Sequence, residues 1–104
     1  MRQPKKFSDN TLVSVQMDNA FWQLSRTQNI KSESLTSYST VFESKDYYLL
    51  RSYGNFVACI SKKSRVCYNA EMRLELRSEI VQEHIKFFME KYHAIYEIVY
   101  KPYH

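Results

Sequence analysis

Apolar and polar positions alternate along the middle of the chain with the period of β-strands. Between Leu35 and Phe42 the period is two, as expected for a strand with one half-exposed side. Gly54 and Asn55 supply residues that tolerate positive φ, so a tight reversal is predicted there. The predicted strands are 37–42, 47–53, 56–60, 65–68, 72–77 and, at the end, 95–100.

Residues 79–93 change to a helical period. Ser78 is a suitable N-cap, and Glu79 suits the positive end of the helix dipole. The apolar positions follow the spacing i, i+4, i+7, i+8 and i+11, which predicts one stripe facing a sheet. The residues of this stripe are Val81, Ile85, Phe88, Met89 and Tyr92.

The N-terminal third has a weaker pattern. Residues 1–10 are polar and are expected to form a flexible arm. A short strand is predicted over 12–17 from the alternation of Val13, Val15 and Met17. A short helix is predicted over 20–28, capped by Asp18 or Asn19, and the polar segment 29–37 is expected to be a loop.

These elements predict one α+β domain over residues 11–104. Its fold is expected to be an antiparallel meander of about five to six strands, packed by one main C-terminal helix and a short N-terminal helix. The interior of the chain holds one Gly and no Pro, which leaves no flexible linker between domains. An apolar content of 44% in 104 residues is enough for a core without metals or disulfides.

The location follows from the absence of membrane and export signals. No apolar run approaches the length of a membrane span. The basic start, Met1 to Lys6, is followed by polar residues rather than by the apolar region of a signal peptide. We therefore expect a cytoplasmic protein, and reduced thiols at Cys59 and Cys67.

The two cysteines lie on either side of a predicted hairpin turn. A turn centred on Lys63 would place Cys59 opposite Cys67, with Cβ atoms about 4.5–5.5 Å apart. Two small buried apolar side chains explain this pattern, while a redox pair and a metal pair remain alternatives. Their spacing matches no common zinc motif.

No catalytic, cofactor-binding or metal-binding residues are predicted. The chain has no glycine-rich phosphate loop, no Gly-x-Ser-x-Gly elbow and no His-Glu-x-x-His helix. His84, His93 and His104 lack the spacing of metal ligands, and His84 is expected to be a satisfied or surface residue. The composition therefore favours a protein that is not an enzyme.

The net charge of +4 comes from the middle of the chain. Residues 51–77 hold six basic and two acidic side chains, whereas the flanking segments are close to neutral. Such an excess favours a phosphate backbone or an acidic protein surface as partner. The predicted partner-binding residues are Lys62, Lys63, Arg65, Arg51, Arg73 and Arg77.

Tyrosines alternate with these cations and leave three interpretations open. Stacking aromatics beside cations suit single-stranded nucleic acid, and Tyr with Arg equally suits a protein hot spot. Alternatively the tyrosines line the core and the lysines serve solubility. If the basic patch is not the partner surface, the aromatic surface around Phe21 and Trp22 is the next candidate.

The segment from Ser52 to Ala58, a following strand that ends in Tyr, and a helix with His84-Ile85 and Phe88 together carry a resemblance. They resemble small uncharacterised proteins of bacteriophages and mobile elements with the pattern Ser-Tyr-x-x-x-Val-Ala, a hairpin, and His-Ile-x-x-Phe. The resemblance covers about residues 47–92. It departs where Thr or Ser usually opens the helix, because Glu75-Leu76-Arg77-Ser78 stands there.

The resemblance implies a phage accessory protein, in a setting that includes anti-CRISPR inhibitors. Together with the charge, it favours an inhibitor that blocks a host CRISPR nuclease complex, meeting acidic protein or guide RNA. The alternative is a small nucleic-acid-binding accessory or regulatory protein. Salt dependence separates the two, because phosphate contacts weaken steeply with salt.

Overall fold

The computed structural model describes residues 5–74 and 79–102. They form seven strands, two α-helices and one short 3₁₀ helix. In chain order these are β1 (Lys5–Ser8), α1 (Asn10–Ser25), β2 (Lys31–Thr36), β3 (Ser39–Glu43), β4 (Tyr47–Ser52), β5 (Asn55–Ser61), β6 (Val66–Asn69), η1 (Glu71–Leu74), α2 (Glu79–Lys91) and β7 (Tyr96–Val99). The fold is therefore α+β.

All seven strands belong to one mixed sheet, in the order β1-β7-β6-β5-β4-β3-β2. Strands β2 to β6 form an antiparallel meander, of which the sequence predicted β3 to β6 but not β2. Strand β7 was predicted as a strand of the antiparallel meander, but it pairs in parallel with β6 and with β1, and β1 was not predicted. A parallel neighbour needs a long crossover, and the segment with η1 and α2 supplies it between β6 and β7.

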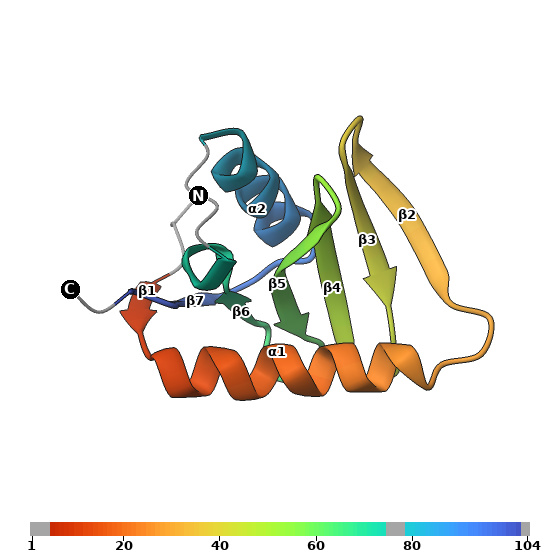
Figure 1. Cartoon of the computed structure of the whole chain (residues 1–104), viewed down its shortest axis with the longest axis horizontal. Coiled ribbons are helices and arrows are strands. Elements are labelled where there is room, and N and C mark those ends of the chain that lie inside the picture. The colour runs from red at the N-terminus through yellow and green to blue at the C-terminus, as the bar shows by residue number, and fades with distance from the viewer. Residues whose placement is uncertain (1–4, 75–78, 103–104) are drawn as a thin grey trace.

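The two helices pack on opposite faces of the sheet. One core cluster joins α2 to the sheet through residues such as Ile85, Phe88 and Leu50, and the other joins α1 through Val13, Met17 and Leu49. Figure 1 shows α1 running across the foot of the strands, with α2 near their other end. Burial on both faces explains why β5 is almost continuously apolar.

Helix α1 replaces both the strand and the shorter helix that were predicted for this region. It begins after Asp9, whose carboxylate accepts a 3.0 Å hydrogen bond from the Leu12 N–H and caps the helix. The prediction was wrong because the alternation that suggested a strand includes Val15, which is 47% exposed. The buried positions instead have helical spacing: Val13, Met17, Ala20 and Leu24.

The predicted arm over residues 1–10 is wrong for the part that the structure describes. Residues 5–8 form β1, which pairs in parallel with β7. The backbone then enters α1 directly, and the Asp9 N–H donates to the Val99 carbonyl at 3.2 Å. The ladder with β7 orders this polar segment, a contact between chain ends that local patterning does not reveal. Residues 1–4 lie outside the described residues.

Two further predictions need correction. The predicted loop over 29–37 contains β2, an edge strand whose side chains are mostly exposed and therefore show no apolar alternation. The predicted strand over 72–77 is wrong for residues 72–74, which belong to the 3₁₀ helix η1, in which Glu71 is buried. The remainder of that strand, and the predicted cap Ser78, lie outside the described residues.

The C-terminal predictions are confirmed. Val81, Ile85 and Phe88 are buried beneath α2, and Met89 and Tyr92 pack against the same cluster.

The hairpin between β4 and β5 reverses at Tyr53 and Gly54, with φ angles of 49° and 82°. This reversal is one residue earlier than predicted. In the described ranges, neither helix is long and apolar enough to cross a membrane.

Candidate binding site

The structure brings together three of the six predicted basic residues. Lys62, Lys63 and Arg65 lie in the turn between β5 and β6. Tyr47 at the start of β4 pairs with Ser61 beside this turn, so the start of β4 lies at the same end of the sheet. The other predicted residues are elsewhere or outside the described part: Arg51 near the far end of β4, Arg73 in η1, and Arg77 outside the described residues.

Several of these cations have partners within the protein. The Lys62 ammonium lies 2.6 Å from Glu43, and Arg73 lies 3.4 Å from Asp18. Arg65 donates a 3.0 Å hydrogen bond to the carbonyl of Tyr92, just beyond the end of α2. Part of the excess positive charge is therefore paired with acceptor groups within the protein.

Lys63 is exposed, and it differs from Lys62 and Arg65 because it lines a groove. The groove has a volume of about 770 Å³ and lies between the C-terminal half of α1 and the turns that follow β3 and β5. This volume falls within the usual range for ligand pockets. The lining residues are Asn19, Trp22, Gln23, Arg26, Thr27, Asp46, Tyr47, Ser61 and Lys63.

A hydrogen-bond network around Gln23 holds the walls of the groove together. The Gln23 Oε1 accepts from the Ser44 hydroxyl at 2.7 Å and from the Asp46 N–H at 2.8 Å. Its Nε2 donates to the Asp46 carboxylate at 2.7 Å. The Lys62 N–H donates to the Asp46 carbonyl at 2.9 Å, which ties the two turns to each other. The groove is therefore built by three elements that are fixed to one another.

Trp22 and Arg26 form the aromatic side of the groove. The Trp22 side chain is 59% exposed, because it lies on the side of α1 opposite the buried stripe. The Arg26 guanidinium lies 4.1 Å from the centre of the indole ring, in a cation–π contact. Trp22 was predicted from the sequence as an aromatic candidate, whereas Arg26 was not, because its role comes from its contact with the Trp22 ring.

Tyr47 also lines the groove. Its hydroxyl donates a 2.6 Å hydrogen bond to Gln16 on α1. Loss of hydration on burial raises the pKa of Tyr47, with a smaller contribution from Cys59. Tyr47 is therefore neutral at physiological pH.

The lining of the groove carries a net positive charge. Its charged residues are the cations Arg26 and Lys63 and the carboxylate Asp46. Lys62, which precedes Lys63, is already paired with Glu43. The surplus of positive charge favours an anionic partner.

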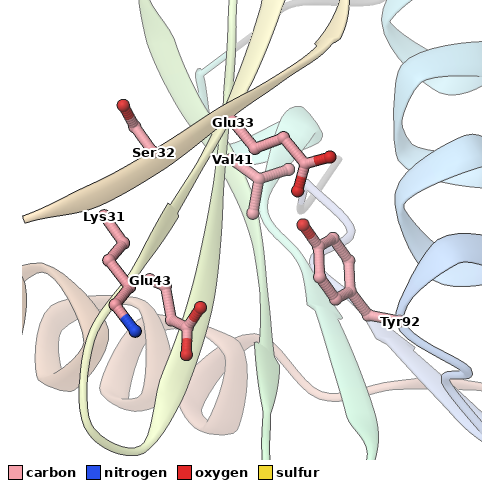
Figure 2. A pocket seen from close by; sticks show the side chains of 6 residues that line it. All are labelled: Lys31, Ser32, Glu33, Val41, Glu43 and Tyr92. Carbon is pink, nitrogen blue, oxygen red and sulfur yellow. The ribbon is translucent and has the colours of Figure 1, made fainter.

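A second, smaller groove of about 360 Å³ lies between the β2–β3 edge of the sheet and the end of α2 (Figure 2). In Figure 2 the Glu33 carboxylate and the Tyr92 hydroxyl point toward the same space. Glu33 forms an ion pair with Lys91, however, and Glu43 forms one with Lys62. Because these charges are matched internally, this groove is a weaker candidate. It is lined by Lys31, Ser32, Glu33, Val41, Glu43 and Tyr92.

His84 makes a third polar cluster, at the far end of the sheet. Its Nδ1 lies 2.8 Å from the Ser52 hydroxyl and its Nε2 lies 3.1 Å from the Thr36 hydroxyl. Its ring stacks on Tyr53, which stacks on Tyr38. Desolvation lowers the pKa of His84, although Glu83 opposes this change. His84 is thus a buried histidine with both nitrogens hydrogen-bonded, as the sequence suggested.

The Ser52–His84 contact has the spacing of a nucleophile and a base, but both residues are inside the protein. Ser52 is fully buried and His84 is 5% exposed. A nucleophile must reach the substrate, and this hydroxyl is covered. The arrangement therefore fits a structural hydrogen-bond network.

The predicted pairing of the two cysteines is wrong by one residue. Cys59 pairs with Tyr68, and Cys67 pairs with Ile60. A shift of one residue reverses the face on which a side chain lies, so Cys59 packs in the α1 cluster and Cys67 in the α2 cluster. Within residues 5–74 and 79–102, no group of three or more His, Cys, Asp or Glu side chains is placed to hold a metal ion.

Comparisons with protein-family models, with curated proteins and with solved structures found no match.

Proposed function

We propose that this protein is a non-catalytic binding protein that holds an anionic partner in the groove between α1 and the two turns. The observation that supports this proposal is the exposed Trp22–Arg26 pair beside Lys63. Exposing a large aromatic ring costs solvation free energy, and Trp and Arg are enriched at binding hot spots. The hydrogen bonds of Gln23 fix α1 relative to the turn after β3. Less conformational entropy is therefore lost when a partner binds.

The partner surface in this proposal is narrower than the basic patch predicted from sequence. It keeps Lys63, with Lys62 at its edge, and adds Trp22 and Arg26 from α1. Arg51 lies at the other end of the sheet, and Arg73, in η1, is paired with Asp18 of α1; neither lines the groove. The site thus depends on the way the fold joins α1 to the turns rather than on a run of basic residues.

The sequence resemblance supports a more specific form of the proposal. We propose that the protein is encoded by a phage or mobile element and blocks a host CRISPR nuclease complex in the cytoplasm. Such a complex carries guide RNA and is therefore anionic in part. An electropositive groove suits an anionic partner of this kind. The positive charge argues against a protein that acts as an acidic mimic of DNA. The alternative function is a nucleic-acid-binding accessory or regulatory protein, and the Trp22–Arg26 pair favours it equally.

Affinity capture from a bacterial lysate containing a CRISPR nuclease complex tests this proposal. The baits are the tagged wild type, Lys63→Glu, Trp22→Ala, and the matched controls Lys86→Glu and Phe87→Ala, which change exposed residues of α2. Each capture is run with and without nuclease treatment.

The wild type and both controls are expected to retain a common partner that Lys63→Glu and Trp22→Ala lose. A purified effector should then cleave target DNA more slowly when the wild type is present. Capture of the same partner by all five baits would refute the groove as the binding site. Unchanged cleavage would refute the inhibitor form of the proposal.

A further inference from the structure

We infer that the groove binds a single-stranded polynucleotide, with a base stacked on the Trp22–Arg26 pair and a phosphate held by Lys63. This inference rests on the proposed function and specifies the chemistry of the partner. It follows from three properties of the groove: an exposed planar pair, cations in its lining, and polar groups between them.

The planar pair provides a stacking platform. Unpaired bases stack on aromatic rings and on Arg guanidinium planes. Trp22 and Arg26 supply one of each, 4.1 Å apart and both exposed. The turn after β3 and the turn after β5 form the other wall, so a base that stacks here also enters the groove.

The groove lining carries both signs of charge, on turns that the hydrogen bond from the Lys62 N–H to the Asp46 carbonyl joins. Lys63 lies at the end of the groove formed by the β5–β6 turn, where Lys62 is its neighbour. Asp46 lines the groove as well, and its carboxylate would repel a phosphate. A phosphate is therefore directed to Lys63, and the amino groups of a base edge are directed to Asp46. Asn19, Thr27 and Ser61 supply further hydrogen-bonding groups.

A single strand fits this arrangement better than two other anionic ligands. In a duplex the faces of the bases are stacked inside the helix, where Trp22 cannot reach them. An acidic peptide would satisfy Lys63 but offers carboxylates rather than planar rings to the indole. The combination of a platform with cations is the usual basis of single-strand binding without strict sequence preference.

Trp22 also provides the assay, because it is the single Trp of the chain. Its fluorescence is recorded while oligonucleotides of about 12 residues, a usual single-strand site size, are added at two salt concentrations. The ligands are single-stranded DNA, single-stranded RNA, the matching duplex and polyglutamate. We expect saturable quenching by a single strand, with log affinity falling by about 0.7 per neutralised phosphate for each log unit of salt.

The variants are compared by the anisotropy of a labelled single strand, which does not depend on Trp fluorescence. Lys63→Glu and Trp22→Ala should bind at least tenfold more weakly, whereas Lys86→Glu and Phe87→Ala, which change exposed residues outside the groove, should bind within about twofold of the wild type. Absence of single-strand binding at low salt would overturn the inference. So would equal affinity for polyglutamate or for the duplex.

Failure of the polynucleotide inference can be distinguished from failure of the proposed function. Capture of a nuclease-resistant partner that depends on Lys63, without oligonucleotide binding, would refute the polynucleotide inference and leave the binding function standing. Retention of that partner by both groove variants would instead refute the proposed site.

Discussion

The thiols of Cys59 and Cys67 lie on opposite faces of the sheet although the two residues are on adjacent strands. Cys59 is the partner of Tyr68, and Cys67 is the partner of Ile60. Each is fully buried, Cys59 beneath α1 and Cys67 beneath α2. The sheet itself therefore separates the two sulfur atoms.

The first prediction concerns the reactivity of these thiols. Burial raises the pKa of both, and Glu97 adds to the effect at Cys67, so the reactive thiolate is disfavoured. A thiol reagent should label neither residue in native protein and both in denaturant. A mild oxidant should form no internal disulfide while the protein is folded. Fast labelling of native protein, or an internal disulfide in a folded species, would contradict this arrangement.

The second prediction concerns the stripe of α2. Ile85 and Phe88 are fully buried, so Ile85→Ala should lower the free energy of unfolding by about 2–5 kcal/mol and Phe88→Ala by about 3–5 kcal/mol. The neighbouring Phe87 is 44% exposed, and Phe87→Ala should change stability by about 0.5 kcal/mol or less. Urea melts of the three variants measure these differences. Equal losses of unfolding free energy for Phe87→Ala and Phe88→Ala would mean that Phe88 is not on the side of α2 that packs against the sheet.

The third prediction concerns His84 and pH. An unfolded His has a pKa near 6.5, and burial lowers the pKa of His84 in the folded protein. The unfolded state therefore binds more protons as pH falls below about 6.5, so stability decreases, with a slope of at most about 1.4 kcal/mol per pH unit for one proton.

His84→Gln should flatten this slope when unfolding is measured between about pH 7.5 and 5. His93 is exposed and has a positive φ of 55°, so His93→Asn is a suitable control and should keep the slope of the wild type. If His84→Gln retained the full slope, the pH dependence would belong to other groups.

The fourth prediction concerns Gln23. Gln23→Ala removes the three hydrogen bonds to Ser44 and Asp46 and leaves the buried Ser44 hydroxyl with its weaker 3.3 Å contact to the Tyr47 carbonyl. The free energy of unfolding should fall by about 1–3 kcal/mol, and binding in the groove should weaken with it. Gln82 is exposed on α2, and Gln82→Ala should change neither. Unaltered stability in Gln23→Ala would mean that the network does not hold the groove.

Sequence patterns predicted the elements in which the buried side chains recur with the period of a helix or of a strand. Helix α2 has one buried stripe, and the strands β4 and β5 are rich in residues that favour sheets, so both were found. Helix α1 was shortened because Val15, Phe21 and Trp22 add exposed apolar side chains that obscure its stripe. Strand β1 was missed because its ladder joins residues that are about 90 positions apart in the chain.

The candidate site was only partly visible in the sequence for the same reason. Lys63 was found from local charge, and Trp22 was named as an alternative. Both residues line one groove because three separate segments of the chain meet at Gln23 and Asp46. The register of the β5–β6 hairpin, which carries the two cysteines, also differs by one residue from the predicted register. The basic residues that looked equivalent in the sequence proved different, because Lys62, Arg65 and Arg73 have partners inside the protein.

We propose that the groove lined by Trp22, Arg26 and Lys63 binds an anionic partner. The most direct test is to titrate the captured partner with wild type, Lys63→Glu and Lys86→Glu at two salt concentrations. The two variants carry the same change of charge, so they differ only in where the charge lies. We predict that Lys63→Glu loses at least tenfold in affinity, about 1.4 kcal/mol, while Lys86→Glu stays within about twofold. Equal affinities for the two variants would show that the partner does not bind in this groove.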